Sequence, residues 1–164
     1  MLHRAPEPAS RMFALGAGLL GHGLLPAADR EVVTARVTVR SGCAYESGVR
    51  AAALAAQAGL SPEQLRATAG FGPRAPDVRE PRHAALIAAV DELHDTARLS
   101  RPTWDTPRGY YTDEQLLELL VLAGWYRTIS YLANGLLLEE ESWSVPFPAS
   151  TAPAAPPEGG VSSP

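Results

Sequence analysis

One short stretch of the sequence, residues 31–50, holds most of the side chains that could do chemistry. Cys43 is the only cysteine of the chain, and Glu46 and Arg50 follow it at positions i+3 and i+7. On a helix, these three side chains would project from one face. A thiol, a carboxylate and a guanidinium on one face form a candidate active site. The same residues are equally consistent with a buried cysteine beside an exposed ion pair, so the sequence leaves both interpretations open.

The chemistry of these residues depends on their surroundings. Cys43 lies near an expected helix start, where exposed amide groups favour a thiolate. Glu46, one turn later, disfavours a second negative charge, and free cysteine often packs as a small apolar side chain. A solvated pair of Glu46 and Arg50 contributes only about 0.3–0.5 kcal/mol. Only in a pocket would Arg50 anchor a carboxylate and Glu46 act as an acid or base.

The composition indicates one soluble domain. The 164 residues are 46% hydrophobic and carry a net charge of −4, which allows a sizeable core but not the positive surface that nucleic acids need. No secretory signal is evident, and the apolar stretch 116–138 is interrupted by Glu118, Arg127 and Asn134. We therefore expect no membrane span, no nucleic-acid partner and a cytoplasmic location.

The numbers and positions of the cysteine and histidine residues argue against disulfide, two-thiol and metal sites. A single cysteine excludes a disulfide or a two-thiol redox couple within one chain and suits a reducing cytoplasm. The histidines, at positions 3, 22, 83 and 94, have no metal-ligand spacing with another histidine, cysteine or carboxylate. His83 and His94 are instead expected at a helix start and on a polar helix face. We expect neither a metal site nor a cofactor.

Residues 31–40 give conflicting signals of secondary structure. Val33, Ala35, Val37 and Val39 alternate with polar residues, a pattern that favours a strand by its period and its β-branched side chains. Acidic residues soon after Pro26 are typical of a helix start. From the residues alone, a strand is the preferred interpretation.

Elsewhere the sequence predicts helices separated by loops. The segments SPEQ at 61–64 and TDEQ at 112–115 are capping boxes that open helices, and Gly59 is typical of the position after a helix end. Residues 1–140 form the expected domain, and the Pro/Ala-rich residues 141–164 form an expected disordered tail. The expected helices are 8–25, 44–58, 61–69, 83–97 and 112–138, with a loop over 70–81 and a linker over 98–111.

Several short segments are similar, in this order, to those of a known family. They are Leu25-Pro26 ahead of Arg30-Glu31-Val32-Val33, then Cys43-Ala44-Tyr45-Glu46, Ala58-Gly59-Leu60-Ser61-Pro62-Glu63, Val90-Asp91-Glu92-Leu93, Thr103-Trp104, Tyr111-Thr112-Asp113-Glu114-Gln115-Leu116, Tyr126-Arg127 and Asn134. By these segments the sequence resembles the carboxymuconolactone decarboxylase superfamily, which includes the alkyl hydroperoxidase D proteins. The resemblance covers about residues 8–138.

The resemblance implies an all-helical, alkyl hydroperoxidase D-like domain. Residues 31–40 would then be helical, which overrules the alternating pattern. It also implies that the subunits form homotrimers, often assembled into homohexamers, through helix hairpins. A long apolar last helix without a polar stripe fits burial between subunits.

The sequence also departs from the family at the residues that carry its chemistry. The peroxidase branch has a Cys-x-x-Cys segment, a histidine four residues later and a glutamate twelve residues before the first cysteine. Glu31 and Cys43 match that glutamate and first cysteine, whereas Glu46 replaces the second cysteine and Arg50 the histidine. The Tyr-Glu branch usually continues with tryptophan and histidine, where this chain has Ser47 and Arg50. The resemblance therefore leaves acid–base work to Glu31, Glu46 or Cys43.

Three functions are compatible with these residues. The preferred one is an enzyme that decarboxylates, isomerises or otherwise cleaves a small organic acid or related metabolite, with Glu31, Cys43 and Glu46 catalytic and Arg50 and Tyr45 binding the substrate. The second is a peroxide reductase of the peroxiredoxin type that works through Cys43 alone. The third is a non-catalytic oligomeric binding protein.

Overall fold

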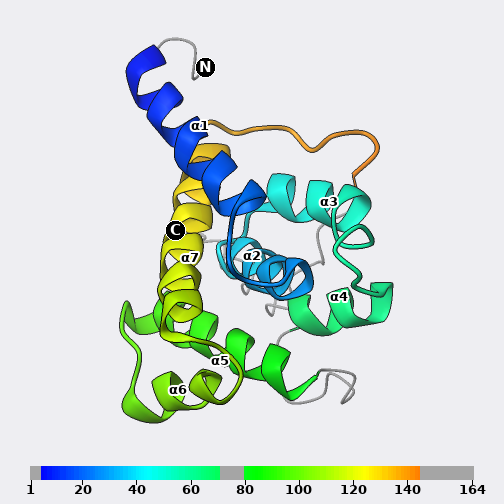
Figure 1. Ribbon diagram of the computed structural model, residues 1–164. Coiled ribbons are helices and arrows are strands. Elements are labelled where there is room, and N and C mark those ends of the chain that lie inside the picture. The colour runs from blue at the N-terminus through cyan, green and yellow to red at the C-terminus, as the bar shows by residue number, and fades with distance from the viewer. Residues whose placement is uncertain (1–4, 71–79, 145–164) are drawn as a thin grey trace, which may run out of the picture.

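A central helix surrounded by the others organises the fold. The structure, a computed structural model, describes residues 5–70 and 80–144, and within these ranges every regular element is helical. Helix α2 lies in the middle, with α3, α4, α5 and α7 packed around it (Figure 1). The elements are α1 (Pro6–Gly21), α2 (Ala27–Arg40), α3 (Ala44–Ala53), α4 (Pro62–Ala69), α5 (Pro81–Thr96), α6 (Arg101–Asp105), the short 3₁₀ helix η2 (Pro107–Gly109) and α7 (Asp113–Gly135).

Helix α2 contains the residues whose alternation favoured a strand. Every residue from Glu31 to Val39 is buried, because helices pack against α2 on all sides. A helix without a solvent-facing side has no polar stripe, so the helical period is missing from its sequence. The strand is therefore wrong, and the helix implied by the resemblance is confirmed. The buried hydroxyl of Thr34 donates to the carbonyl of Arg30 at 2.9 Å and so leaves no unpaired donor.

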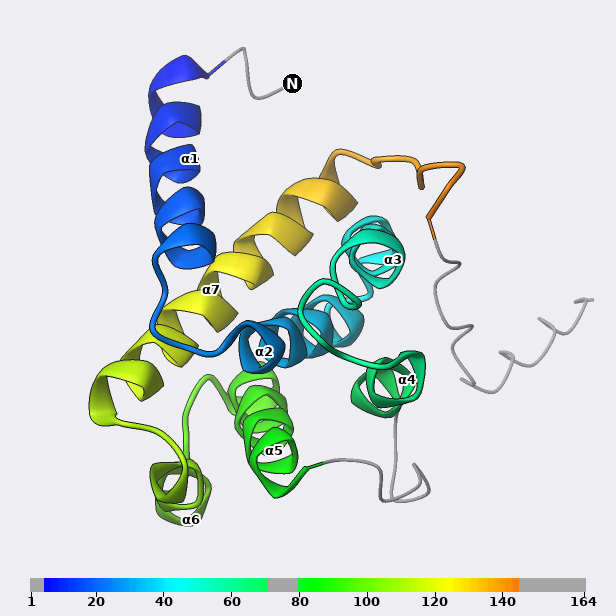
Figure 2. The same cartoon turned by 45° about the vertical axis from the view of Figure 1, so that its right-hand side comes forward.

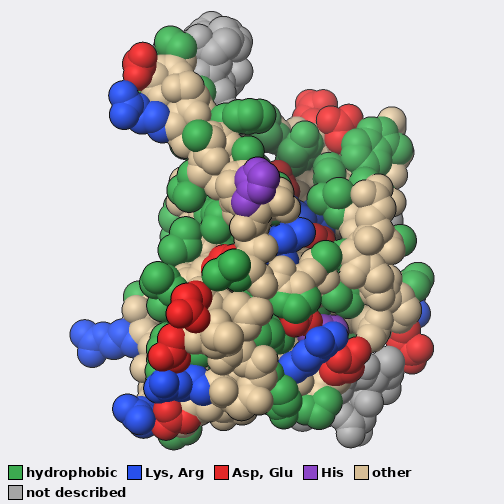
Figure 3. Space-filling view, viewed as in Figure 1, with side chains coloured by type: hydrophobic (Ala, Val, Ile, Leu, Met, Phe, Trp, Pro, Cys, Tyr) green, Lys and Arg blue, Asp and Glu red, His purple; other side chains and the backbone are tan. Residues whose placement is uncertain are grey.

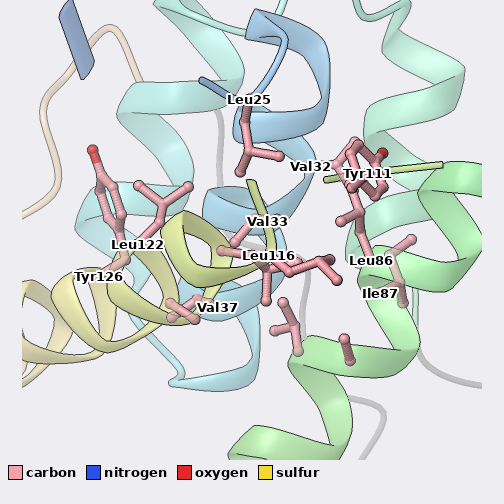
Figure 4. Close-up of a cluster of buried hydrophobic side chains, with 14 of the residues drawn as sticks. Leu25, Val32, Val33, Val37, Leu86, Ile87, Tyr111, Leu116, Leu122 and Tyr126 are labelled. Atoms are coloured by element: carbon pink, nitrogen blue, oxygen red, sulfur yellow. The ribbon is translucent and has the colours of Figure 1, made fainter. Parts of the chain in front are cut away.

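The hydrophobic core lies between α2, α5 and α7. Figure 4 shows apolar side chains from these helices meeting in one cluster. Helix α7 is long and apolar enough to cross a membrane by length and composition, a test that core helices also pass, and Leu116, Leu119 and Leu122 are buried in this core. The labelled members of the cluster are Leu25, Val32, Val33, Val37, Leu86, Ile87, Tyr111, Leu116, Leu122 and Tyr126.

A buried arginine joins three helices. Nε and Nη2 of Arg36 on α2 each donate to Asp91 of α5 at 2.7 Å, a bidentate ion pair. Its Nη1 also donates to the carbonyls of Thr68 and Gly70, at the end of α4, at 3.0 and 2.8 Å. Only a planar guanidinium can reach all these acceptors at once. Arg36 therefore holds α4 and α5 against the central helix.

A second buried pair joins the first turns of α2 and α5. Oδ1 of Asp29 lies 2.8 Å from Nε2 of His83 and 3.4 Å from Nε of Arg82. Burial raises the pKa of Asp29, but the bond to His83 and the charge of Arg82 help to bring it below its ordinary value. This carboxylate therefore adds stability above its ordinary pKa, and the contribution is lost as the pH falls through the lowered value. His83 lies at a helix start as expected, and it is buried.

Both predicted capping boxes are present. The hydroxyl of Ser61 accepts from the backbone N–H of Gln64 at 3.1 Å, and the side chain of Gln64 accepts from the backbone N–H of Ser61 at 2.9 Å. Thr112 and Gln115 form the same reciprocal pair at the start of α7. These bonds satisfy amide groups that a helix start otherwise leaves unpaired.

Other boundaries differ from the predicted ones. Helix α3 ends at Ala53 rather than at residue 58, because the chain turns there and buries Ala55 and Leu60. Gly59 follows with a φ of +85°, which glycine adopts without strain. The linker 98–111 contains α6, capped by Ser100, and η2. The predicted loop and tail fall largely on residues 71–79 and 145–164, which lie outside the described residues.

Helix α1 stands away from the bundle (Figure 2). It meets α7 where Gly16 lies against the indole of Trp125, so closely that a Cβ at Gly16 would be 3.0 Å from the ring. Hydrophobic side chains are exposed along α1 and α7 (Figure 3). They include Phe13, Leu15 and Leu20 on α1 and Leu117 and Val121 on α7.

We predict that Arg36→Met lowers the free energy of unfolding by about 3 kcal/mol, because Asp91 and two carbonyls lose a buried partner. Chemical denaturation measures this loss. Arg101→Met is the matched control, since Arg101 forms an exposed pair with Asp105, and it is expected to leave the stability nearly unchanged. Equal losses in both variants would contradict the role assigned to Arg36.

Candidate functional site

The guanidinium of Arg50 is the centre of a polar cluster buried between three helices. Its Nη1 donates to Oε2 of Glu31 on α2 at 2.6 Å, and its Nη2 donates to the hydroxyl of Tyr126 on α7. The guanidinium carbon also lies 4.3 Å from the centroid of the Tyr126 ring, a cation–π distance. The hydroxyl of Tyr126 points away from the apolar cluster (Figure 4). Helices α2, α3 and α7 thus each contribute one side chain to this cluster.

Glu46 is the member of the cluster nearest to solvent. It lies one turn before Arg50 on α3, with its Oε2 3.7 Å from Nε of Arg50, too far for a hydrogen bond. The side chain of Glu46 is 21% exposed, whereas those of Arg50 and Glu31 are 4% and 7% exposed. A small molecule approaching from solvent would therefore meet Glu46 before the other two.

Both carboxyl groups hold a proton more readily than in water. Burial raises the pKa of Glu31 and of Glu46 above the ordinary value, and the positive charge of Arg50 offsets only part of this effect. Glu31 has the close ion pair with Arg50, which favours its charged form. Glu46 lacks a hydrogen bond from Arg50, so it is the better proton donor of the two.

Two polar atoms of the cluster are buried without a hydrogen-bond partner. They are Oε1 of Glu31 and Nε of Arg50. Buried polar atoms are almost always paired in folded proteins, and exceptions often mark the place of a water molecule or a ligand. One acceptor and one donor are thus available beside Glu46.

Cys43 is the N-cap residue of α3, one turn before Glu46, and its side chain has different surroundings from Arg50. It is completely buried, and its backbone N–H donates to the carbonyl of Thr38 at 2.9 Å. Burial raises the pKa of the thiol, and hydrogen bonds from the Glu46 backbone and the Ser130 hydroxyl offset only part of this. Arg50 is not among the charges that act on the thiol. Cys43 therefore packs as a small apolar side chain, one of the two interpretations left open by the sequence.

Tyr45 lies beside the cluster without joining it. It is partly exposed, and its hydroxyl forms none of the hydrogen bonds found within the described residues. Burial and the charges of Glu141 and Glu46 raise the pKa of Tyr45. Of the five predicted site residues, the structure brings together Glu31, Glu46 and Arg50, and places Tyr45 and Cys43 at the edge.

Two hydroxyl residues of α7 belong to this region, although the sequence analysis gave them no role. Tyr126 binds Arg50, and Ser130 lies beside the thiol of Cys43. Tyr126 and Ser130 are four residues apart and therefore share one face of α7. That face continues with buried apolar residues such as Leu119 and Leu122. In the sequence, the pair of hydroxyl residues on an otherwise apolar helix face was the feature that could have indicated their role.

The solved structures that are similar to this chain share its fold. One is a protein of unknown function from Agrobacterium tumefaciens, proposed to be the antioxidant defence protein AhpD, with a TM-score of 0.77, 20% identity, and coverage of 85% of this chain and 94% of that chain. Another is an uncharacterized peroxidase-related protein with an alkylhydroperoxidase AhpD core from Ralstonia eutropha JMP134, with a TM-score of 0.74, 16% identity and coverage of 86% and 74%. A peroxidase-related protein from Silicibacter sp. TM1040 has a TM-score of 0.70, 14% identity and coverage of 83% and 71%.

At these identities the likeness shows the fold alone. No curated protein sequence matches the chain significantly. The sequence does match a family description over residues 6–92, a range that includes α1 to α4 and most of α5 and that carries Glu31, Cys43, Glu46 and Arg50. By this match, the chain belongs to the carboxymuconolactone decarboxylase family.

Proposed function

We propose that the protein is an enzyme that removes carbon dioxide from a small organic acid, with Glu46 as its general acid. The observation that carries this proposal is the pair of carboxyl groups with raised pKa on either side of one buried guanidinium. Perturbed acids around a fixed charge are typical of sites that move protons. Membership of the family supports a reaction of this class.

The proposed step requires one proton donor. When the carboxylate carbon leaves as carbon dioxide, the electron pair of the broken bond stays on the neighbouring carbon, which must then bind a proton. Protonated Glu46 supplies that proton, becomes a carboxylate beside Arg50 and regains a proton from solvent. The raised pKa of Glu46 enlarges the fraction of enzyme that holds the proton.

Arg50 stabilises the charge that forms on Glu46. Because arginine remains charged at all accessible pH values, it cannot replace the family's histidine in transferring protons. Part of its guanidinium is also engaged inside the cluster, which limits the anchoring of a substrate carboxylate that we expected from the sequence. Nη1 and Nη2 each already donate one N–H, to Glu31 and Tyr126, and Nε is the guanidinium nitrogen that has no hydrogen-bond partner.

We predict that Glu46→Gln lowers turnover about 100-fold or more, because the general acid is lost. Wild-type turnover should fall as the pH rises through the pKa of Glu46, which lies above 4.5. The assay follows carbon dioxide release from carboxymuconolactone and from a panel of β-keto and lactone acids.

The control is Glu63→Gln, which makes the same change at an exposed position of α4. It should keep both the rate and the pH profile. Unchanged turnover in Glu46→Gln would refute the assignment. No turnover of any acid by the wild type, together with no thermal stabilisation by these acids, would favour the non-catalytic alternative.

Peroxide reduction through Cys43 is the alternative function, since the similar solved structures are described as AhpD-like or peroxidase-related proteins. It needs a reactive thiolate, whereas burial raises the pKa of this thiol. We predict that Cys43 reacts with iodoacetamide far more slowly than a free thiol does at neutral pH, and that its rate rises only at a higher pH than the rate of a free thiol, because burial raises its pKa. Denatured protein is the control for full reactivity. Fast alkylation of the folded protein near pH 7 would restore the peroxidase hypothesis.

A homotrimer or homohexamer is the assembly we propose for this enzyme. Exposed apolar side chains on α1 and α7, such as Phe13 and Leu117, support it, because large apolar surfaces are usually covered by a partner. Sedimentation velocity is expected to give three or six times the mass of one chain. A monomer at micromolar concentration would contradict the proposal.

A further inference from the structure

A cavity of about 500 Å³ lies between α2, α5 and α7, apart from the Arg50 cluster. None of its lining residues belongs to that cluster, and the α7 residues that line it lie on a different face from Tyr126. Its volume is within the range of pockets that bind small molecules. The lining residues are Val37, Val90, Leu93, His94, Ala97, Leu120, Ala123, Gly124, Arg127 and Tyr131.

The walls of this cavity are mostly apolar, and one charged side chain lies in them. Nε of Arg127 donates to the hydroxyl of Tyr131 at 2.9 Å, and its Nη1 donates to Nδ1 of His94 and, at 3.5 Å, to the hydroxyl of Ser41. All three partners are neutral groups when His94 is unprotonated. Burial and the charges of Arg127 and Arg40 lower the pKa of His94, which favours that neutral form.

Arg127 therefore lacks a neutralising partner. Within residues 5–70 and 80–144, no carboxylate lies within ion-pair distance of it, and its Nη2 has no hydrogen-bond partner. The nearby acids are engaged elsewhere, since Asp91 binds Arg36 and Asp95 binds Arg40. A partly buried guanidinium without a counter-ion attracts an anion, and a carboxylate fits its fork of donors.

We propose that this cavity is a second ligand site, which binds a monocarboxylate with an apolar body. The carboxylate would bind Nη2 of Arg127, and the apolar body would lie against Val37, Val90 and Leu120. An apolar pocket with a single cation selects this class of ligand, because the walls exclude polar molecules and the cation favours an anion over its neutral analogue.

Octanoate and its neutral analogue octanamide test this proposal by titration calorimetry on the full chain. We expect octanoate to bind at least tenfold more tightly than octanamide. Arg127→Met, which keeps the apolar bulk of the side chain, should weaken octanoate at least tenfold and leave octanamide unchanged. Arg101→Met, at an exposed position, and Glu46→Gln, in the other site, should both bind octanoate as the wild type does.

A variant that fills the cavity tests whether the two compounds bind there. A Cβ at Gly124 would meet no atom within 4 Å, so Gly124→Leu can fold with its side chain at the cavity and should abolish binding of both compounds. Three results would overturn the proposal. These are equal affinity for the two compounds, octanoate binding that survives Arg127→Met, and no binding by the wild type. In the last case, a change of oligomeric state in Gly124→Leu would mean that a second copy of the chain covers the cavity.

Discussion

A helix that is buried on every side must neutralise each polar side chain it carries, and this requirement shapes the whole structure. Helix α2 carries Asp29, Glu31 and Arg36 in its interior-facing turns. Each is matched by a partner on a neighbouring helix. Asp29 pairs with His83 at the start of α5, Glu31 with an arginine of α3, and Arg36 with Asp91 further along α5 and with two carbonyls at the end of α4. Since an unmatched buried charge costs several kcal/mol, each pair specifies which helix packs where.

The same requirement explains the character of the candidate site. Arg50 favours the charged form of Glu31 and offsets part of the cost of its burial, and Arg50 is bound in turn by Tyr126. A histidine at that position would exchange its proton near neutral pH, whereas an arginine keeps its charge permanently. Replacing one by the other converts a proton carrier into a fixed positive charge. The carboxyl at the solvent-facing edge is then the group left to exchange protons.

Sequence reasoning predicted the parts of the fold that depend on local interactions. The capping boxes at 61–64 and 112–115 are reproduced because they need only neighbouring residues. The identity of α2 could not be derived from its own residues, because complete burial removes the polar face on which helix prediction depends. The helical assignment of residues 31–40 came from the resemblance to the family. In the site, the spacing of Glu46 and Arg50 was sufficient to predict that they lie together. The role of Tyr126 could not be predicted in this way, because it depends on a contact between residues 76 positions apart.

The packing of helix α1 against α7 requires a residue without a side chain at position 16. At Gly16 the backbone of α1 lies against the Trp125 indole, at a separation that even alanine would widen. We therefore expect the emission of Trp125, one of the three tryptophans, to report whether α1 is docked. Helix α1 packs mainly against α7 and adds Leu19 to the hydrophobic core, whereas none of the buried ion pairs of α2 involves it. Its position is therefore the part of this fold on which the buried charges depend least.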